Sequence, residues 1–351
     1  MTAERESSII FCRLFIEFCN KLEIIKKVDK HMKAKTFFKF FLTFLVLFTL
    51  IFIPIVKAVS NINIFTQSEG VESIEEEMDV LVDSSSPFFN AFKDAKRLNL
   101  LMVGVNQKMT DTIMLISWDM KNDKVDVISV PRDTYYEREG HTSAAEKKIN
   151  AAYGSDGIVG TANAVSDVLY GIPINYYAVV DYDAVRAIVD GIGGVPIDVP
   201  QAMNYKDPYD TPPLVINIPA GYQTLDGDHA VQYLRYRHGY ANGDIGRVEA
   251  QQKFVKAAFK QCLKHGIVDS VKLICTNVES DLTIGAASKY ALSAMGLEED
   301  SITTYTVPGE GQYIGKTSYY LQDQQATEEM LTEIYGIDSD STTDSAVDED
   351  D

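Results

Sequence analysis

Short apolar runs separated by polar turns dominate the middle of the chain and predict strands mixed with helices. Residues 98–105, 112–118 and 124–130 are rich in β-branched side chains and have the length of strands. The polar residues 121–123 between the last two runs predict a β-hairpin. Further strands are expected at 177–180, 195–199, 214–218 and 302–307, and helices at 158–169, 182–190 and 248–265. This pattern predicts the α/β class, with a mixed β-sheet sandwiched by helices.

A different pattern, an apolar run without charge, occupies residues 40–56. Residues 36–38 extend the run beyond Lys39, whose ammonium group can reach the membrane interface. Because about 20 apolar residues span a bilayer, we predict a transmembrane helix over 36–57. Two alternatives stay open, a buried core helix and a signal peptide cleaved near Ala58.

Lys and Arg residues are concentrated before this run, whereas acidic residues dominate after it. The positive-inside rule therefore places residues 1–35 in the cytoplasm and the main domain outside, as in a single-pass protein of the cell membrane. Met32 begins a compact basic leader and is an alternative start of the protein.

The formal net charge of −19 argues against a nucleic-acid partner, because nucleic-acid binding draws on Lys and Arg facing phosphates. The acidic, Ser-rich residues 58–95 predict an extracytoplasmic stalk, and the acidic residues 338–351 predict a disordered tail. The functional domain is then expected at 96–337. Within it, Cys262 and Cys275 either pair in an oxidising space or stay free.

Two arginines separated by one residue stand out in a chain this acidic. Arg235 and Arg237 follow a short helix predicted at 228–233, and in an extended backbone their side chains share a face. Two guanidinium groups so close repel each other unless an anion lies between them, and their forks match phosphate oxygens. Arg247 begins the helix predicted at 248–265, where free N–H groups also favour an anion. A phosphate site is therefore predicted, with a solvated basic stripe as the alternative.

A fourth arginine is expected near the same edge of the sheet. Arg132 and Asp133 follow Pro131, which ends the strand predicted at 124–130. Clefts of α/β sheets lie at such strand ends. Taken alone, these two residues are as well explained by a surface ion pair.

An acidic residue and a lysine complete the candidate chemistry. Asp111 opens the strand predicted at 112–118, and beside a polyphosphate it is a candidate Mg²⁺ ligand, or otherwise an ordinary strand-start residue. Lys148 supplies another cation before a helix. The sequence has no Walker A, HExxH or GxSxG motif, and glycines near 191–194 read as a turn after a helix.

Together these segments resemble the LytR–CpsA–Psr family of cell-wall glycopolymer transferases. The resemblance covers about residues 98–265, and its motifs lie at 100–104, 111–115, 129–134, 148–153, 189–195, 227–238 and 243–252. It implies an α/β/α sandwich with an apolar pocket for a polyprenyl chain. It also implies an extracytoplasmic phosphotransferase that moves a glycopolymer, such as teichoic acid or capsule, from an undecaprenyl pyrophosphate carrier to peptidoglycan of a Gram-positive type of cell wall.

The resemblance further assigns roles to residues of the site. It implies that the pyrophosphate is held by Arg132, Arg235, Arg237 and Arg247, assisted by Lys148 and Gln251. It implies that Asp111 binds the metal, Mg²⁺ or Mn²⁺, or orients the acceptor, so that the catalytic set is Asp111, Arg132, Arg237 and Arg247.

Two positions depart from the family's pattern. Asn106 stands where a second metal-site Asp is common, and Met109 stands where an Arg is common. An amide oxygen can ligate Mg²⁺ without adding charge, so Asn106 joins Asp111 as an expected metal ligand. The alternative functions are a non-catalytic binding protein for polyprenyl pyrophosphates and an envelope regulator of the transcriptional-attenuator kind.

Overall fold

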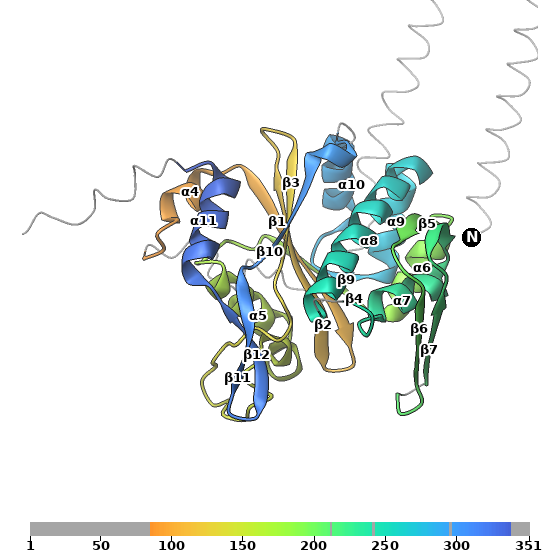
Figure 1. Cartoon of the computed structure of the whole chain (residues 1–351). Coiled ribbons are helices and arrows are strands. Elements are labelled where there is room, and N and C mark those ends of the chain that lie inside the picture. Colours follow the sequence, from red (N-terminus) through yellow and green to blue (C-terminus); the bar gives the residue numbers. More distant parts are fainter. Residues whose placement is uncertain (1–84, 211–212, 241–242, 295–296, 338–351) are drawn as a thin grey trace, which may run out of the picture. The chain divides into compact units, whose positions relative to one another are not determined.

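The computed structural model describes residues 85–210, 213–240, 243–294 and 297–337 (Figure 1). The chain divides into two compact units, Met1–Thr66 and Gln67–Asp351, and every described residue belongs to the second. The predicted cytoplasmic segment, the anchor at 36–57, most of the stalk and the tail at 338–351 lie outside the described residues. Among the described helices, none combines the length and the apolar character needed to cross a bilayer.

A six-stranded mixed sheet forms the centre of the domain, as the sequence predicts. Its order is β10-β3-β2-β1-β4-β9. Neighbours β1, β2 and β3 are antiparallel, whereas β4 is parallel to β1 and β10 is parallel to β3. The carboxyl ends of β1, β3, β4 and β10 therefore share one edge. The strands are β1 (Arg97–Asn106), β2 (Met109–Asp119), β3 (Lys124–Ser129), β4 (Tyr176–Val180), β9 (Glu279–Ser280) and β10 (Ile302–Thr306).

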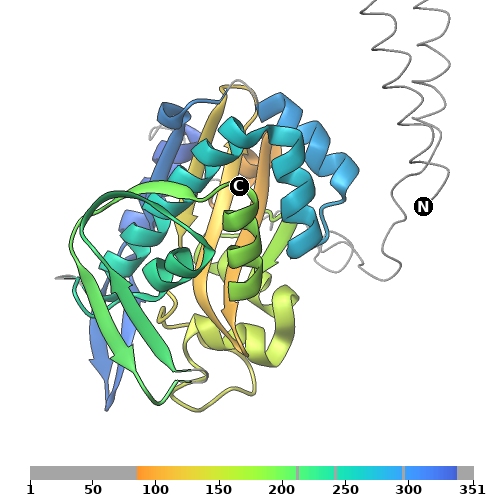
Figure 2. The same cartoon turned by 90° about the vertical axis from the view of Figure 1, so that its right-hand side faces the viewer.

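Successive side chains of a strand point to opposite faces of the sheet, and both faces of this sheet carry apolar side chains. Helices therefore cover both faces (Figure 1). On one face, Leu101 and Leu115 pack against α4 (Phe89–Asp94), α5 (Ala152–Val168) and α11 (Gln324–Tyr335). On the other face, Met114 and Trp118 pack near α8 (Asp244–His265) and α10 (Ile284–Ser293). Figure 2 shows the teal helix α8 lying in front of the orange strands.

The folded domain begins earlier than predicted. Phe88 and Phe92, in the segment assigned to the stalk, are buried in the core beside α5 and α11. The predicted boundary at residue 96 is therefore too late, because the two aromatic side chains belong to the core. Helix α5 likewise begins six residues before the predicted 158, since Gly157 (φ 66°) interrupts its helical backbone and disguises the pattern.

A smaller layer with a core of its own lies beside the main sheet. Helices α6 (Tyr182–Gly191) and α7 (Gly227–Arg235) pack with α8 and α9 (Ile267–Asn277) around buried Val189 and Tyr233. Gly193 (φ 82°) and Gly194 (φ 84°) turn the chain from α6 into the next strand, as the sequence predicts. Two antiparallel pairs complete the layer: β5 (Val195–Val199) with β8 (Gly221–Leu225), and β6 (Met203–Asp207) with β7 (Leu214–Ile218).

Two remaining features concern the C-terminal third. The hairpin of β11 (Gly309–Ile314) and β12 (Thr317–Gln322) was not predicted, because β11 is exposed along its whole length and has no apolar alternation.

Cys262 on α8 and Cys275 on α9 are free thiols, so the possible disulfide is not formed. Burial raises the pKa of both thiols and disfavours the reactive thiolate.

Candidate functional site

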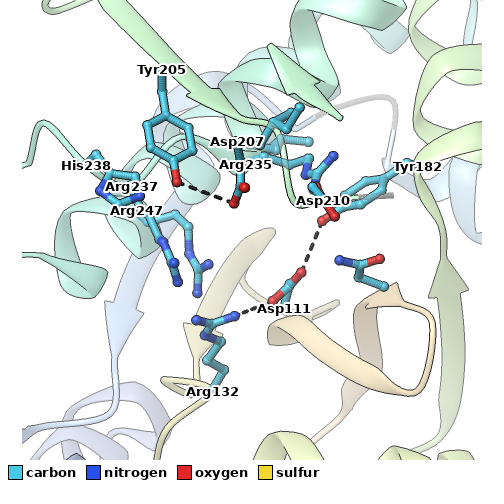
Figure 3. A pocket seen from close by; sticks show the side chains of 13 residues that line it. Asp111, Arg132, Tyr182, Tyr205, Asp207, Asp210, Arg235, Arg237, His238 and Arg247 are labelled. Atoms are coloured by element: carbon cyan, nitrogen blue, oxygen red, sulfur yellow. Dashed lines mark hydrogen bonds and ion pairs between the residues drawn. The ribbon is translucent and has the colours of Figure 1, made fainter. Parts of the chain in front are cut away.

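Most of the predicted site residues meet at the edge of the sheet where β1 and β3 end and β2 begins. A cavity of about 200 Å³ opens there, lined by Asn106, Asp111, Arg132, Tyr182, Tyr205, Asp207, Asp210, Leu214, Leu234, Arg235, Arg237, His238 and Arg247 (Figure 3). A bulge helps to aim Asp111: Gly104 pairs with Thr112 and Val105 with Thr110, which leaves Asp111 without a direct partner on β1. Bulges of this kind redirect a side chain beside functional sites.

Four arginines converge on this cavity from three separate segments. Arg235 is the last residue of α7, whereas the sequence predicted an extended backbone from residue 234. The extended conformation begins two residues later than predicted, at buried Tyr236 (φ −68°, ψ 129°), and Arg235 and Arg237 still both line the cavity. Arg247 lies in the first turn of α8. Figure 3 shows Arg132, Arg237 and Arg247 with their guanidinium groups close together.

Carboxylates hold Arg132 in place at the cavity. Its guanidinium forms an ion pair with Asp111 Oδ1, and its Nε lies 4.0 Å from Asp244 Oδ1. Burial opposes the charge of Arg132, but the attraction of Asp111 and Asp244 outweighs it and raises the pKa of the guanidinium. Arg132 is thus a fixed cation at the end of β3.

Arg247 is the most deeply buried cation of the cluster. It is 4% exposed, and its Nη2 lies 2.8 Å from Asp244 Oδ1. Burial lowers its pKa, and the nearby charges of Arg132 and Arg237 add to this effect. The Nε groups of both Arg132 and Arg247 are buried and lack a hydrogen-bond partner in the described structure. An anion bound between the guanidinium groups would relieve their repulsion.

The opposite side of the cavity is acidic and aromatic. The Tyr182 hydroxyl donates a hydrogen bond of 3.1 Å to Asp111 Oδ2, and the Arg235 guanidinium lies 4.8 Å from the centre of the Tyr182 ring. Arg235 also forms an ion pair with Asp210. Asp207 accepts hydrogen bonds from the Tyr209 backbone N–H at 3.0 Å and from a tyrosine hydroxyl at 3.5 Å.

Sequence reasoning missed this acidic and aromatic side. Asp207 and Asp210 flank the connection between β6 and β7, two strands whose alternate side chains are largely exposed. Nothing in the local pattern marks them as functional. Tyr182 follows the N-cap Asp181 of α6, and only the packing of α6 beside β1 brings its hydroxyl to Asp111.

Two predicted substrate-binding residues stand outside the cavity lining. Lys148 Nζ lies 3.1 Å from Asp133 Oδ1 and 5.8 Å from the centre of the Tyr319 ring. Gln251 is buried and donates to the Leu234 carbonyl at 3.4 Å, so it supports the chain just before Arg235. Their assistance to a bound pyrophosphate remains a prediction.

Asn106 and Asp111 supply side-chain oxygen atoms that suit a magnesium ion whose remaining ligands come from outside the protein. Asn106 and Asp111 both line the cavity, whereas Met109 is 44% exposed and is not part of the lining. Both Asp111 oxygens already accept hydrogen bonds, from Arg132 and Tyr182. Within the described ranges, no group of three His, Cys, Asp or Glu side chains is placed to hold a metal. These donors fit Mg²⁺ when waters and substrate phosphates supply its remaining ligands.

Comparison with known proteins agrees with this architecture. The TagV protein of Bacillus subtilis, named polyisoprenyl-teichoic acid–peptidoglycan teichoic acid transferase, is 27% identical over 243 residues, which cover 66% of this chain and 62% of that protein. The match thus spans less than two thirds of that relative. The TagU protein of Oceanobacillus iheyensis, with a corresponding name, is 27% identical over 259 residues, which cover 70% of this chain and 77% of TagU.

A solved structure shows the same fold. The crystal structure of B. subtilis TagV matches with a TM-score of 0.59 at 26% identity, over 69% of this chain and 98% of that one. The model of the LytR_cpsA_psr family matches residues 61–335, which include the central sheet and every residue that lines the cavity. The chain therefore belongs to the LytR_cpsA_psr family.

Proposed function

We propose that the protein is an extracytoplasmic phosphotransferase that moves a glycopolymer from an undecaprenyl pyrophosphate carrier to peptidoglycan. One observation carries the proposal: four arginines converge on one cavity in a chain of net charge −19. The names of the TagV and TagU relatives, which are teichoic acid transferases acting on peptidoglycan, favour this class of reaction. An anchor at 36–57 would hold the domain at the membrane, where such a carrier resides.

The arginines supply what a bound pyrophosphate requires. We name Arg132, Arg235, Arg237 and Arg247 the arginine clamp. Guanidinium forks bind phosphate oxygens in pairs, and they do not lose their charge at neutral pH. Because Arg132 and Arg247 are fixed by Asp111 and Asp244, little side-chain freedom is lost when the substrate binds. Phosphoryl transfer depends mainly on such positioning and on charge neutralisation.

The reaction itself is a displacement at phosphorus. The acceptor hydroxyl oxygen forms a bond to the polymer-side phosphorus, the bond to the bridging oxygen breaks, and the polyprenyl phosphate leaves. Within the described residues, Asp207 is a cavity carboxylate with no ion-paired cation, so it is placed to take the proton of the hydroxyl. Mg²⁺ held by Asp111 and Asn106 would neutralise part of the phosphate charge.

An apolar layer beside the clamp suits the polyprenyl chain. Between the sheet and helices α8 and α10, Met102, Ile116 and Phe259 are only partly buried, although they project from the sheet or towards it. The opposite face of the sheet is closed by fully buried side chains such as Leu101 and Leu115. We assign the isoprenoid chain to the face that carries these partly buried apolar side chains.

A second function, binding without transfer, is favoured by one observation. Asn106 provides no negative charge at the expected metal site. A carrier or envelope sensor would use the same arginine clamp to hold a polyprenyl pyrophosphate. It would bind the lipid with no turnover, whether Mg²⁺ or Mn²⁺ is supplied.

One experiment separates the two functions. The full chain in detergent is incubated with a prenyl-pyrophosphate-linked saccharide, Mg²⁺ and peptidoglycan oligomers, and the products are analysed by mass spectrometry. We expect glycan transfer that is lost in Arg237→Ala, whose side chain is not ion-paired in the described structure and can be removed without leaving a buried carboxylate. Transfer at an unchanged rate in Arg237→Ala would contradict the proposal. Lipid binding without transfer would favour the carrier.

A further inference from the structure

A second polar groove lies on the outer side of α8. Its volume is about 260 Å³, and its lining combines one face of α8 with residues of β5 and β8. It shares no lining residue with the cavity that holds the arginine clamp. Four of its lining residues are lysines of α8, which we name the lysine row: Lys253, Lys256, Lys260 and Lys264.

Helix geometry places the lysine row on the face turned away from the site. The intervals of three, four and four residues keep the side chains on one face, spaced by about 4.5–6 Å along the axis over a length of roughly 16 Å. Arg247 and Lys256 are nine residues apart on the same helix, so about 100° per residue puts them on opposite sides of it. One helix thus carries two separate cationic surfaces.

Backbone carbonyl groups orient two lysines of this row, one from the groove lining and one from outside it. Lys253 Nζ donates to the Asp198 carbonyl at 2.6 Å, and Lys256 Nζ donates to the Ile302 carbonyl at 3.3 Å. The groove lining contains four lysines and one acidic residue, Asp198. In a chain of net charge −19, this is a strong local reversal of sign. Tyr222, 77% exposed, forms an aromatic rim.

We infer that this groove binds the polymer part of the donor, a linear polyanion with phosphodiester-linked repeats. The inference rests on the proposed function and adds a second surface that binds the donor, separate from the arginine clamp. Lysine ammonium groups are point charges without a fixed fork, so a row of them can contact repeated anions without fixing their register. The Tyr222 ring offers an apolar face to the carbon skeleton between the phosphates. A planar anionic membrane would instead favour a flat or convex patch, whereas this surface is concave.

Binding of a soluble polymer tests the groove without relying on transfer. The full chain in detergent is titrated with a defined poly(glycerol phosphate) oligomer that lacks a lipid, and affinity is measured by calorimetry. We expect the Lys→Gln change at all four positions of the lysine row to weaken binding by about tenfold, because it removes several weak, exposed ion contacts. The matched control replaces the same number of exposed lysines elsewhere, Lys96, Lys121, Lys124 and Lys289, and should bind as the unaltered chain does.

The outcomes distinguish the groove from the clamp. Equal losses in the two lysine variants, or no loss in either, would overturn the inference. So would a groove variant that loses binding to phosphatidylglycerol vesicles but not to the polymer, since the row would then contact the membrane. Arg237→Ala should still bind the polymer oligomer. Arg237→Ala could retain full transfer activity while polymer binding still depends on the lysine row. That result would contradict the proposed reaction but would support the groove as a polymer-binding site.

Discussion

The two cationic surfaces on α8 differ in chemistry as well as in place. The arginine clamp lies at the edge of the sheet, where Arg247 is 4% exposed and is ion-paired with Asp244. The lysine row lies on the opposite side of the helix, where Lys253, Lys260 and Lys264 are exposed. A buried arginine pair costs desolvation and requires neighbours that fix its geometry. The ammonium group of an exposed lysine is a hydrated point charge without a planar fork.

This difference in burial and side-chain geometry indicates what each surface can do. Fixed forks suit a reacting group whose atoms must be held within a fraction of an ångström. Ammonium groups, which lack a fixed fork, suit a long polymer that must slide while its end is positioned. The clamp is therefore expected to determine the rate and the lysine row the affinity, and this division can be broken by exchanging the two residue types.

The largest effect is expected from Arg247→Lys. The lysine keeps the charge but loses the planar fork beside Asp244, so we expect transfer to fall by about 100-fold, as when a preorganised charge is removed from a transition state. The matched control is Lys264→Arg at the other end of the same helix, which should leave transfer unchanged. Steady-state rates for both variants measure this. Comparable losses in both would mean that the two surfaces do not divide their roles as proposed.

A gain is expected from Asn106→Asp. The added carboxylate lies in the cavity near Asp111 and gives Mg²⁺ a second charged ligand. We expect the Mg²⁺ concentration for half-maximal transfer to fall by about tenfold. Affinity for the polymer oligomer should not change, since the groove shares no lining residue with the cavity. A Mg²⁺ titration of the transfer rate decides this, and an unchanged midpoint would remove Asn106 from the metal site.

A smaller loss is expected from Tyr182→Phe. This change removes the hydroxyl that donates to Asp111 Oδ2 at 3.1 Å but keeps the ring beneath the Arg235 guanidinium. Asp111 then turns more freely, and we expect the turnover rate to fall by about fivefold, as for the loss of one hydrogen bond. Binding of a short prenyl pyrophosphate should be nearly unchanged, because Arg235 stays in place. A large loss of binding with normal turnover would show that the hydroxyl acts on Arg235 instead.

The sequence predicted the fold and the clamp better than it predicted the rest of the site. The strands at 98–105 and 124–130 are confirmed, and their apolar side chains pack against helices on both faces of the sheet. Arg237 was predicted from its spacing to Arg235 and Arg247 from the start of a helix, whereas Arg132 was assigned by the family resemblance; the shared edge of the sheet brings them together. The tertiary contacts between these arginines cannot be predicted from local sequence patterns.

What escaped prediction depends on contacts between distant segments. The pairing of Arg132 with Asp111 needs the bulge in β2, which the hydrophobic pattern does not reveal. Asp207 and Asp210 lie beside an exposed hairpin, where no buried face imposes a pattern. The lysine row is visible as a helical spacing, but its groove exists only because β5 and β8 pack beside α8.

The smallest effect, and the sharpest comparison, concerns salt. Between about 0.05 and 0.5 M NaCl the screening length shrinks several-fold, which weakens exposed ion contacts more than buried ones. We expect the polymer oligomer to lose several-fold more affinity than a short prenyl pyrophosphate over this range, because three of the four lysines in the row are exposed whereas Arg247 is 4% exposed. Parallel titrations of the two ligands on the same protein measure the difference. In the groove variant the polymer's salt dependence should flatten, and in Arg237→Ala it should persist. Equal salt dependence for both ligands would mean that they share one surface, and the polymer would then be held by the arginine clamp.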